Sequence, residues 1–327
     1  MSAKRISAIP GIDPANYMRS PLHGDSQIWL EKNCYIDVWI ELLHALGLEP
    51  HAMLPFTLAV DFEGDQWTFF KPSHGELFDL YGLDVQEMTV WKPLLEHVRE
   101  RLPKGILVAT EADAFWMPDT AGTDYRQTHT KSTIIITELD ETEQRVAYFH
   151  NAGYFEANGE DYQRLFRIDA PADPTFMPFF AEAIRQDRLV RRSTDELVSA
   201  SRSLLQRHLA RCPQNNPVSA FAERFESEFP RLQELGLAHY HAWAFASTRQ
   251  LGAAFELSSS YLRWLAAMGQ QSDVATSAQA FESIAQNCKT LILKVARAVN
   301  AKRAFDAAPI FADMSQAWQR GMDGLSR

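Results

Sequence analysis

From about residue 176 to its end, the chain carries apolar residues at three- and four-residue spacing. The pattern runs through residues 195–211, 218–235, 239–268 and 277–300 and continues in the tail. This period places the apolar side chains on one face of each helix, and such a face has to be buried against another element. We therefore expect the C-terminal part to be a bundle of helices.

The first 170 residues show a mixed pattern. An apolar helix is expected at 34–47, two short β-rich stretches within 55–72, and helices within 74–105. Residues 105–119 predict a strand, and residues 131–151 predict a β-hairpin with a strongly apolar first strand. The three prolines of "DAPADPTFMP", at 169–178, mark a boundary. We expect the α+β fold class, with an α+β domain at 1–170 and an all-α helical bundle at 171–327.

The composition excludes several classes of protein. With 46% hydrophobic and 23% charged residues the chain is typical of a soluble globular protein. The formal net charge of -10 argues against a nucleic-acid partner, which needs a basic face. No apolar run approaches the ~20 residues of a membrane span, and the N-terminus shows no secretory signal. We expect a cytoplasmic protein with no membrane partner.

The cysteines bear on both redox state and metal binding. The chain has three, and none forms a C-x-x-C pair. This spacing predicts neither a disulfide framework nor a metal site. In a reducing cytoplasm the cysteines stay free thiols.

Cys34 lies where a polar loop becomes the apolar helix of "NCYIDVWIELLHALG". A thiol there lies at the positive end of the helix dipole, which stabilises a nucleophilic thiolate. The first-turn N–H groups, with Asn33 and Gln27 as side-chain donors, form an expected oxyanion site. The alternative is structural, because cysteine is often simply buried.

A nucleophilic cysteine needs a base and a group that orients the base. His129 precedes the first strand of the expected hairpin, and His150 and Asn151 end the second. Pairing of the strands would bring His129 and Asn151 to the same end of the sheet. The alternatives are an exposed strand-end histidine and an asparagine that serves a turn.

The order of cysteine, histidine and then Asn or Asp resembles papain-like enzymes. Residues 111–154 resemble the acyltransferase family of butirosin biosynthesis protein H, and the matching positions are Asp113, Pro118, Tyr125, His129, Asp140 and Asn151. The resemblance implies a papain-like N-terminal domain with Cys34 as nucleophile, His129 as base and Asn151 as orienting group. Tyr125, His150 and Asp113 are supporting residues.

The chain departs from these enzymes at two positions. Ser132 stands immediately before the apolar strand, where those families have the histidine, and His129 lies three residues earlier. Asn151 agrees with papain-like enzymes, whereas the butirosin group has Asp. His150 is therefore the alternative base.

The phrases "NCYIDVWIELLHALGLEP" and "DFEGDQWTFFKP" resemble, over essentially the whole chain, an uncharacterised bacterial family, domain of unknown function 1839. The butirosin resemblance implies transfer of an acyl or aminoacyl group from an acyl carrier protein to an amine, through a cysteine thioester. The expected partners are that carrier protein and a small-molecule or carrier-bound acceptor of secondary metabolism. No bound cofactor is expected, apart from the phosphopantetheine arm of the carrier.

An acidic carrier needs a local basic face on this acidic protein. Helical spacing in "AIRQDRLVRRSTDEL" would put most of its arginines on one face, and these are Arg185, Arg188, Arg191 and Arg192. The alternative is a solvated basic stretch between domains.

Two other functions stay open. One is a papain-like cysteine hydrolase, which could be a peptidase, amidase or thioesterase. The other is a non-catalytic binding module of the same fold.

Overall fold

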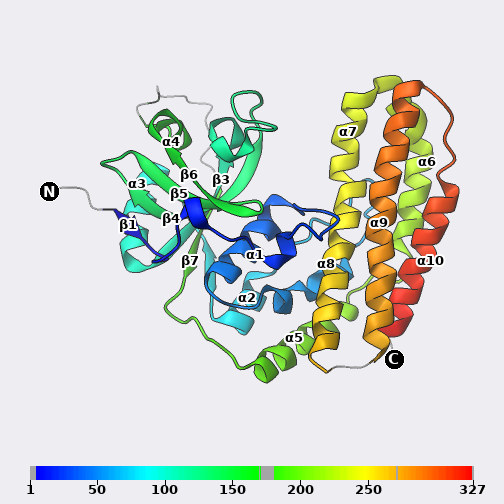
Figure 1. Cartoon of the computed structure of the whole chain (residues 1–327), viewed down its shortest axis with the longest axis horizontal. Helices are drawn as coiled ribbons and strands as arrows, with labels where there is room; N and C mark the ends of the chain where they lie inside the picture. Colours follow the sequence, from blue (N-terminus) through cyan, green and yellow to red (C-terminus); the bar gives the residue numbers. More distant parts are fainter. Residues whose placement is uncertain (1–4, 169, 171–179, 270–271, 326–327) are drawn as a thin grey trace. The chain divides into compact units, whose positions relative to one another are not determined.

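The computed structural model describes residues 5–168, 170, 180–269 and 272–325 (Figure 1). Within these residues the chain divides into two compact units, each discontinuous in sequence. The sheet unit comprises Met1–Pro21, Cys34–Pro50 and Ser73–Arg192, and the bundle unit comprises Leu22–Asn33, His51–Pro72 and Ser193–Arg327. The expected α+β class is confirmed, with an antiparallel sheet first and helices after it.

The sheet has the strand order β2-β7-β3-β4-β5-β6, and β1 pairs with β4. All of these pairs are antiparallel. The strands are β1 (Ile6–Ser7), β2 (Asp84–Glu87), β3 (Ile106–Asp113), β4 (Lys131–Asp140), β5 (Arg145–His150), β6 (Gly153–Asn158) and β7 (Ala181–Arg185). The predicted hairpin is confirmed, because β4 pairs with β5.

Helices cover both faces of this sheet. On one face α1 (Cys34–Ala45) contacts β4, β5 and β6. On the other face α3 (Leu94–Arg101) contacts β3 and β4, and α4 (Gly159–Leu165) contacts β5 and β6. Side chains alternate along a strand, so each residue of β4 faces either α1 or the α3–α4 layer.

The α3–α4 face holds a continuous apolar core. It contains Ile134 and Ile136 of β4, Tyr148 of β5, Val98 of α3 and Tyr162 of α4. On the α1 face, Ile135 of β4 and Phe149 of β5 pair with each other and are fully buried. Burial on both faces explains why β4 is an apolar run with little alternation.

The segment after the expected boundary differs from the prediction. The prolines at 171, 174 and 178 lie outside the described residues, and the next residues form β7, between β2 and β3. The sheet unit thus extends well past residue 170. The helix expected over 183–197 is wrong up to residue 193, because α5 begins only at Thr194 and residues 183–185 belong to β7. Ala, Glu and Arg favour helices but here fill an interior strand.

The bundle unit contains α5 (Thr194–Leu209), α6 (Pro217–Leu235), α7 (Leu237–Ala246), α8 (Thr248–Ala267), α9 (Ser272–Ala301) and α10 (Ala308–Leu325). Helix α9 packs against both α8 and α10, and α6 packs against α10 (Figure 1). The helical period therefore located these elements correctly. No helix in the described ranges is long and apolar enough to span a membrane.

One further helix belongs to the sheet unit. Helix α2 (His74–Tyr81) begins after the cap Ser73, whose hydroxyl accepts from the Glu76 amide, and it ends at Gly82. Residues 55–72 were expected to hold two β-rich stretches. Instead, Pro50–Ala59 is a 3-10 helix and the single bridge Phe62–Trp67 is what remains of the expected pairing.

Candidate functional site

Cys34 is the first residue of α1, and its side chain is half-buried. Its thiol donates a hydrogen bond to the Thr133 hydroxyl of β4, with 3.6 Å between sulfur and oxygen. Thr133 therefore occupies the position opposite the thiol where a catalytic histidine was expected. Within the described residues, the Cys34 thiol makes no other side-chain hydrogen bond.

Charged side chains lie beside Thr133 on the same face of the sheet. Thr133 pairs with Glu111 and Lys131 pairs with Asp113 between β4 and β3, so these four residues share the α1 face. The Lys131 ammonium donates to Glu111 at 2.7 Å. The open end of this face is thus strongly polar, next to the N-terminus of α1.

A second polar group lies one strand further, on β7. Tyr35 donates from its hydroxyl to Glu182 at 2.9 Å, and His74 lies 3.0 Å from the other oxygen of Glu182. Glu182 is 1% exposed. Burial first, and then the charge of Glu182, raise the pKa of Tyr35, so its hydroxyl stays protonated at neutral pH.

His129 lies outside β4 and is largely exposed, with 67% of its side chain accessible. Its Nδ1 is 2.7 Å from Asp113, and its ring stacks on Phe115 at 4.3 Å between centroids. Because Nδ1 is held by the carboxylate, Nε2 is directed away from it. His129 precedes Lys131, the first residue of β4, and its recorded contacts do not include Cys34.

Asn151 does not orient His129 in this structure. It lies in the two-residue turn between His150 and Gly153, with φ of 43°. Asparagine tolerates this left-handed conformation, which supports the turn-forming alternative.

His150 belongs to a buried network on the α3–α4 face. Its Nδ1 is 2.5 Å from Asp119, and its Nε2 is 2.7 Å from the Ser132 hydroxyl. Tyr148 donates to the other oxygen of Asp119 at 2.6 Å. His150 pairs with Ile134, two residues from Ser132, so both lie on the face opposite Thr133 and Cys34. His150 cannot act on the Cys34 thiol through the sheet.

The remaining expected site residues have other partners. The Asn33 amide donates to the Phe70 carbonyl at 3.0 Å, and the Gln27 backbone amide donates to Gly24. Both residues belong to the bundle unit, whereas Cys34 belongs to the sheet unit. The hydroxyl of Tyr125 donates to Asp161 at 2.9 Å, at the start of α4.

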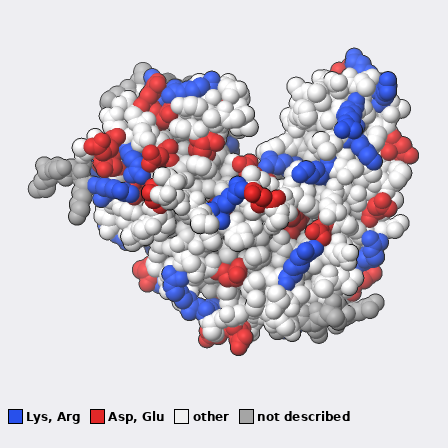
Figure 2. Space-filling view, in the orientation of Figure 1, with Lys and Arg blue, Asp and Glu red and all other residues white. Residues whose placement is uncertain are grey.

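The four arginines do not share a helix face. Arg185 ends β7 and pairs with Asp84 at 3.1 Å, whereas the other three follow it in a connection that precedes α5. Arg191 donates to the Gly47 carbonyl, and Arg192 donates to the Leu80 and Asp79 carbonyls. In Figure 2, positive and negative side chains are interspersed over the visible face.

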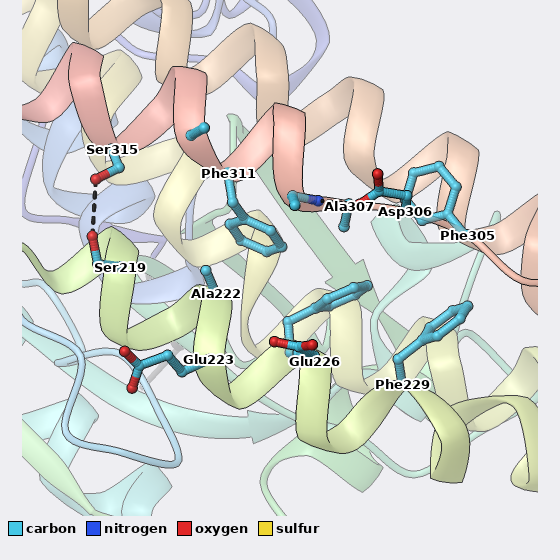
Figure 3. Close-up of a pocket in the computed structure, with 13 residues that line it drawn as sticks. Ser219, Ala222, Glu223, Glu226, Phe229, Phe305, Asp306, Ala307, Phe311 and Ser315 are labelled. Carbon is cyan, nitrogen blue, oxygen red and sulfur yellow. Dashed lines mark hydrogen bonds between the residues drawn. The ribbon is translucent and has the colours of Figure 1, made fainter.

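The bundle unit holds a separate cavity of about 400 Å³ (Figure 3). Its lining includes the aromatic rings of Phe225, Phe229 and Phe311 and the carboxylates of Glu223 and Glu226. Among the described residues no group of three or more His, Cys, Asp or Glu could hold a metal ion.

The sequence did not reveal the residues that contact Cys34, Tyr35 and His150 in the structure. Thr133, His74, Glu182 and Asp119 carried no motif that linked them to Cys34 or to a histidine. The one available signal was Ser132, which stands immediately before the apolar strand, where papain-like families have the histidine. Because side chains alternate along a strand, this position places Ser132 and Thr133 on opposite faces of the sheet.

Comparison with family models identifies the chain. The DUF1839 N-terminal domain matches residues 18–186, and the DUF1839 C-terminal domain matches residues 194–327. The chain therefore belongs to the DUF1839 family, as its motifs suggested. The boundary between the two matches follows β7. A search of the curated proteins found no match.

Proposed function

We propose that the protein is a cysteine-dependent acyltransferase, which moves an acyl or aminoacyl group from a carrier-protein thioester to an acceptor amine. The observation that carries the proposal is the environment of Cys34. Its thiol begins a helix, is half-buried and meets a neutral hydroxyl beside a row of charged side chains. First-turn N–H groups are suited to hold an oxyanion next to such a thiol.

The first step exchanges one thioester for another. The Cys34 sulfur forms a bond to the acyl carbon, the bond from that carbon to the phosphopantetheine sulfur breaks, and the thiol proton passes to the leaving sulfur. A thioester is replaced by a thioester, so the step is close to thermoneutral. In the second step the acceptor nitrogen bonds to the acyl carbon, and the Cys34 sulfur leaves.

The second step needs a group that takes the amine proton, and His129 is our assignment. Asp113 holds its Nδ1 at 2.7 Å, which leaves Nε2 to accept a proton. Asp113 thus replaces Asn151 as the orienting residue. His74 is less suited, because its Nε2 already faces Glu182 and Tyr35.

Carrier docking is assigned to the connection between β7 and α5. Arg188 is exposed, and its side chain makes no hydrogen bond within the described ranges. Arg191 and Arg192 each use some of their guanidinium N–H groups to donate to backbone carbonyl oxygens. Arg185 forms an ion pair with Asp84. Arg188 is therefore the arginine most available to an acidic carrier. A carrier-dependent reaction with a reduced thiol fits a cytoplasmic protein.

The test is intact-mass analysis after incubation with acetyl- and glycyl-loaded carrier protein. The expected result is an acyl adduct on the wild-type protein and on Cys212→Ala, and none on Cys34→Ala. With an amine acceptor present, His129→Gln should keep the adduct and lose its discharge.

Two outcomes would replace the proposal. Release of free acid without transfer to any amine supports the cysteine hydrolase. If no donor gives an adduct while carrier binding persists, the binding module is the better description.

A further inference from the structure

Three residues on the α3–α4 face form a hydrogen-bonded chain that the proposed transfer at Cys34 does not use. Asp119, a carboxylate, can only accept, so the proton between it and His150 belongs to the imidazole Nδ1. This leaves His150 Nε2 as an acceptor, and the Ser132 hydroxyl donates to it at 2.7 Å. The order of serine, imidazole and carboxylate, with each contact on the expected nitrogen, is that of an activated serine nucleophile.

The carboxylate of the chain is fixed by its surroundings. Asp119 is in a 3-10 turn (Pro118–Thr120), and its side chain is 3% exposed. Its second oxygen accepts from Tyr148 at 2.6 Å. Burial, followed by the charge of Asp119, raises the pKa of Tyr148, so this donor stays protonated. Asp119 at Nδ1 and Ser132 at Nε2 therefore fix the orientation of the His150 imidazole.

The serine lies at the rim of the sheet. Residues 126–131 before it are exposed, and Ser132 is the first buried residue of β4 at 8% exposure. It therefore adjoins solvent, whereas His150, at 2% exposure, lies deeper. The hydrogen bond from Ser132 to His150 is itself buried, so the imidazole and the hydroxyl meet where bulk water is largely excluded.

We propose that Ser132, His150 and Asp119 form a second nucleophilic site, which cleaves a carboxylic ester. Ser132 Oγ bonds to the carbonyl carbon while its proton passes to His150 Nε2. The bond from that carbon to the alkoxy oxygen then breaks, and His150 returns the proton to the leaving alcohol. Water repeats the sequence on the acyl-serine and releases the acid, with no further reactant required.

The test is labelling of the full chain with a fluorophosphonate. The Ser132 oxygen bonds to phosphorus, and fluoride leaves with the hydroxyl proton. Trypsin cleaves after Lys131 and Arg145, so the label is expected on the peptide of residues 132–145, at its first residue. Ser132→Ala should lose the label, and His150→Gln should slow labelling by about 100-fold. Ser203→Ala, at an exposed serine of α5, is the matched control.

Two results would overturn the site. One is a folded wild-type protein whose peptide 132–145 gains no phosphonate mass, and this needs no variant to fold. The other is a label that persists in Ser132→Ala. Cys34→Ala should label at the wild-type rate, so a failure of the proposed acyl transfer at Cys34 would leave this result interpretable.

Discussion

The Cys34 thiol and the Thr133 hydroxyl contact each other between α1 and β4, with 3.6 Å from sulfur to oxygen. A hydroxyl is a far weaker base than an imidazole, so Thr133 cannot take the thiol proton as a catalytic histidine does. The proposed reactivity of Cys34 therefore rests on its position at the start of α1.

Alkylation with iodoacetamide should separate the three cysteines. Burial raises the pKa of Cys212 to about 11 and raises that of Cys288 further, so both are almost entirely thiols at pH 8. We expect the folded protein to gain one carbamidomethyl group, at Cys34, at least about ten times faster than any other. Intact mass and peptide mapping give the rates. Equal rates at Cys34 and Cys212 would argue against a reactive Cys34.

Charge reversal at Arg188 should weaken the productive encounter with the carrier. We expect Arg188→Glu to reduce kcat/KM for a loaded carrier by about tenfold, and to leave the rate with a small thioester such as acetyl-N-acetylcysteamine unchanged. The loss should diminish as salt rises. Arg303→Glu, at an exposed arginine of the bundle unit, is the matched control. An equal loss with both substrates would contradict docking at Arg188.

Two glycines of the α2 region should respond oppositely to alanine. Gly82 has φ of 69°, and an added Cβ would overlap the Arg188 carbonyl, so Gly82→Ala should destabilise the sheet unit by about 2–4 kcal/mol. A Cβ at Gly75 meets no atom within 4 Å. Gly75→Ala should therefore be neutral or stabilising by up to about 1 kcal/mol. Urea denaturation measures both, and a similar loss in the two variants would contradict the reasoning.

His97 should make stability depend on pH. Burial lowers the pKa of His97 below the ordinary value of 6.5, and the positive charges of Lys92 and Arg101 lower it further. The negative charges of Glu100 and Glu96 oppose this shift only in part. The folded protein then binds this proton less well than the unfolded chain, so stability falls as the pH drops below about 6.5.

Replacement of His97 should remove this slope. We expect His97→Gln to flatten the free energy of unfolding between pH 5 and 6.5, relative to the wild type, by at most about 1.4 kcal/mol per pH unit. Denaturant titrations at several pH values provide the measurement. The same replacement at exposed His239 is the control, and an unchanged slope in His97→Gln would assign the dependence to other groups.

The sequence predicted those parts of the fold that follow from local periodicity. The helices of the bundle, α1 and the β4–β5 hairpin all carry a pattern within a single segment. Strand β7 does not, because Ala181–Arg185 has helix-favouring residues and becomes a strand only by pairing with β2 and β3. Such pairing is a long-range property that no window of sequence contains.

The site was harder to predict for a related reason. Cys34 was located correctly at a helix start, but its neighbours depend on which face each strand residue takes. A one-residue difference along β4 separates Thr133, beside Cys34, from Ser132, beside His150. Asp119 and Glu182 reach their histidines from distant segments, so spacing along the chain could not reveal either pair.

Strand β4 acts as a partition between two chemically different compartments. A shift of its register by one residue would move the serine under α1 and the threonine against His150, and would disrupt both sets of contacts at once. Its pairing with β3 is regular from Lys131 to Ile136, whereas the irregularity against β5 falls between Ile136 and Glu138. Insertions or sequence changes at the far end of the hairpin can thus be accommodated at that bulge. The register at the other end stays unchanged, so Ser132 and Thr133 remain on opposite faces of the sheet.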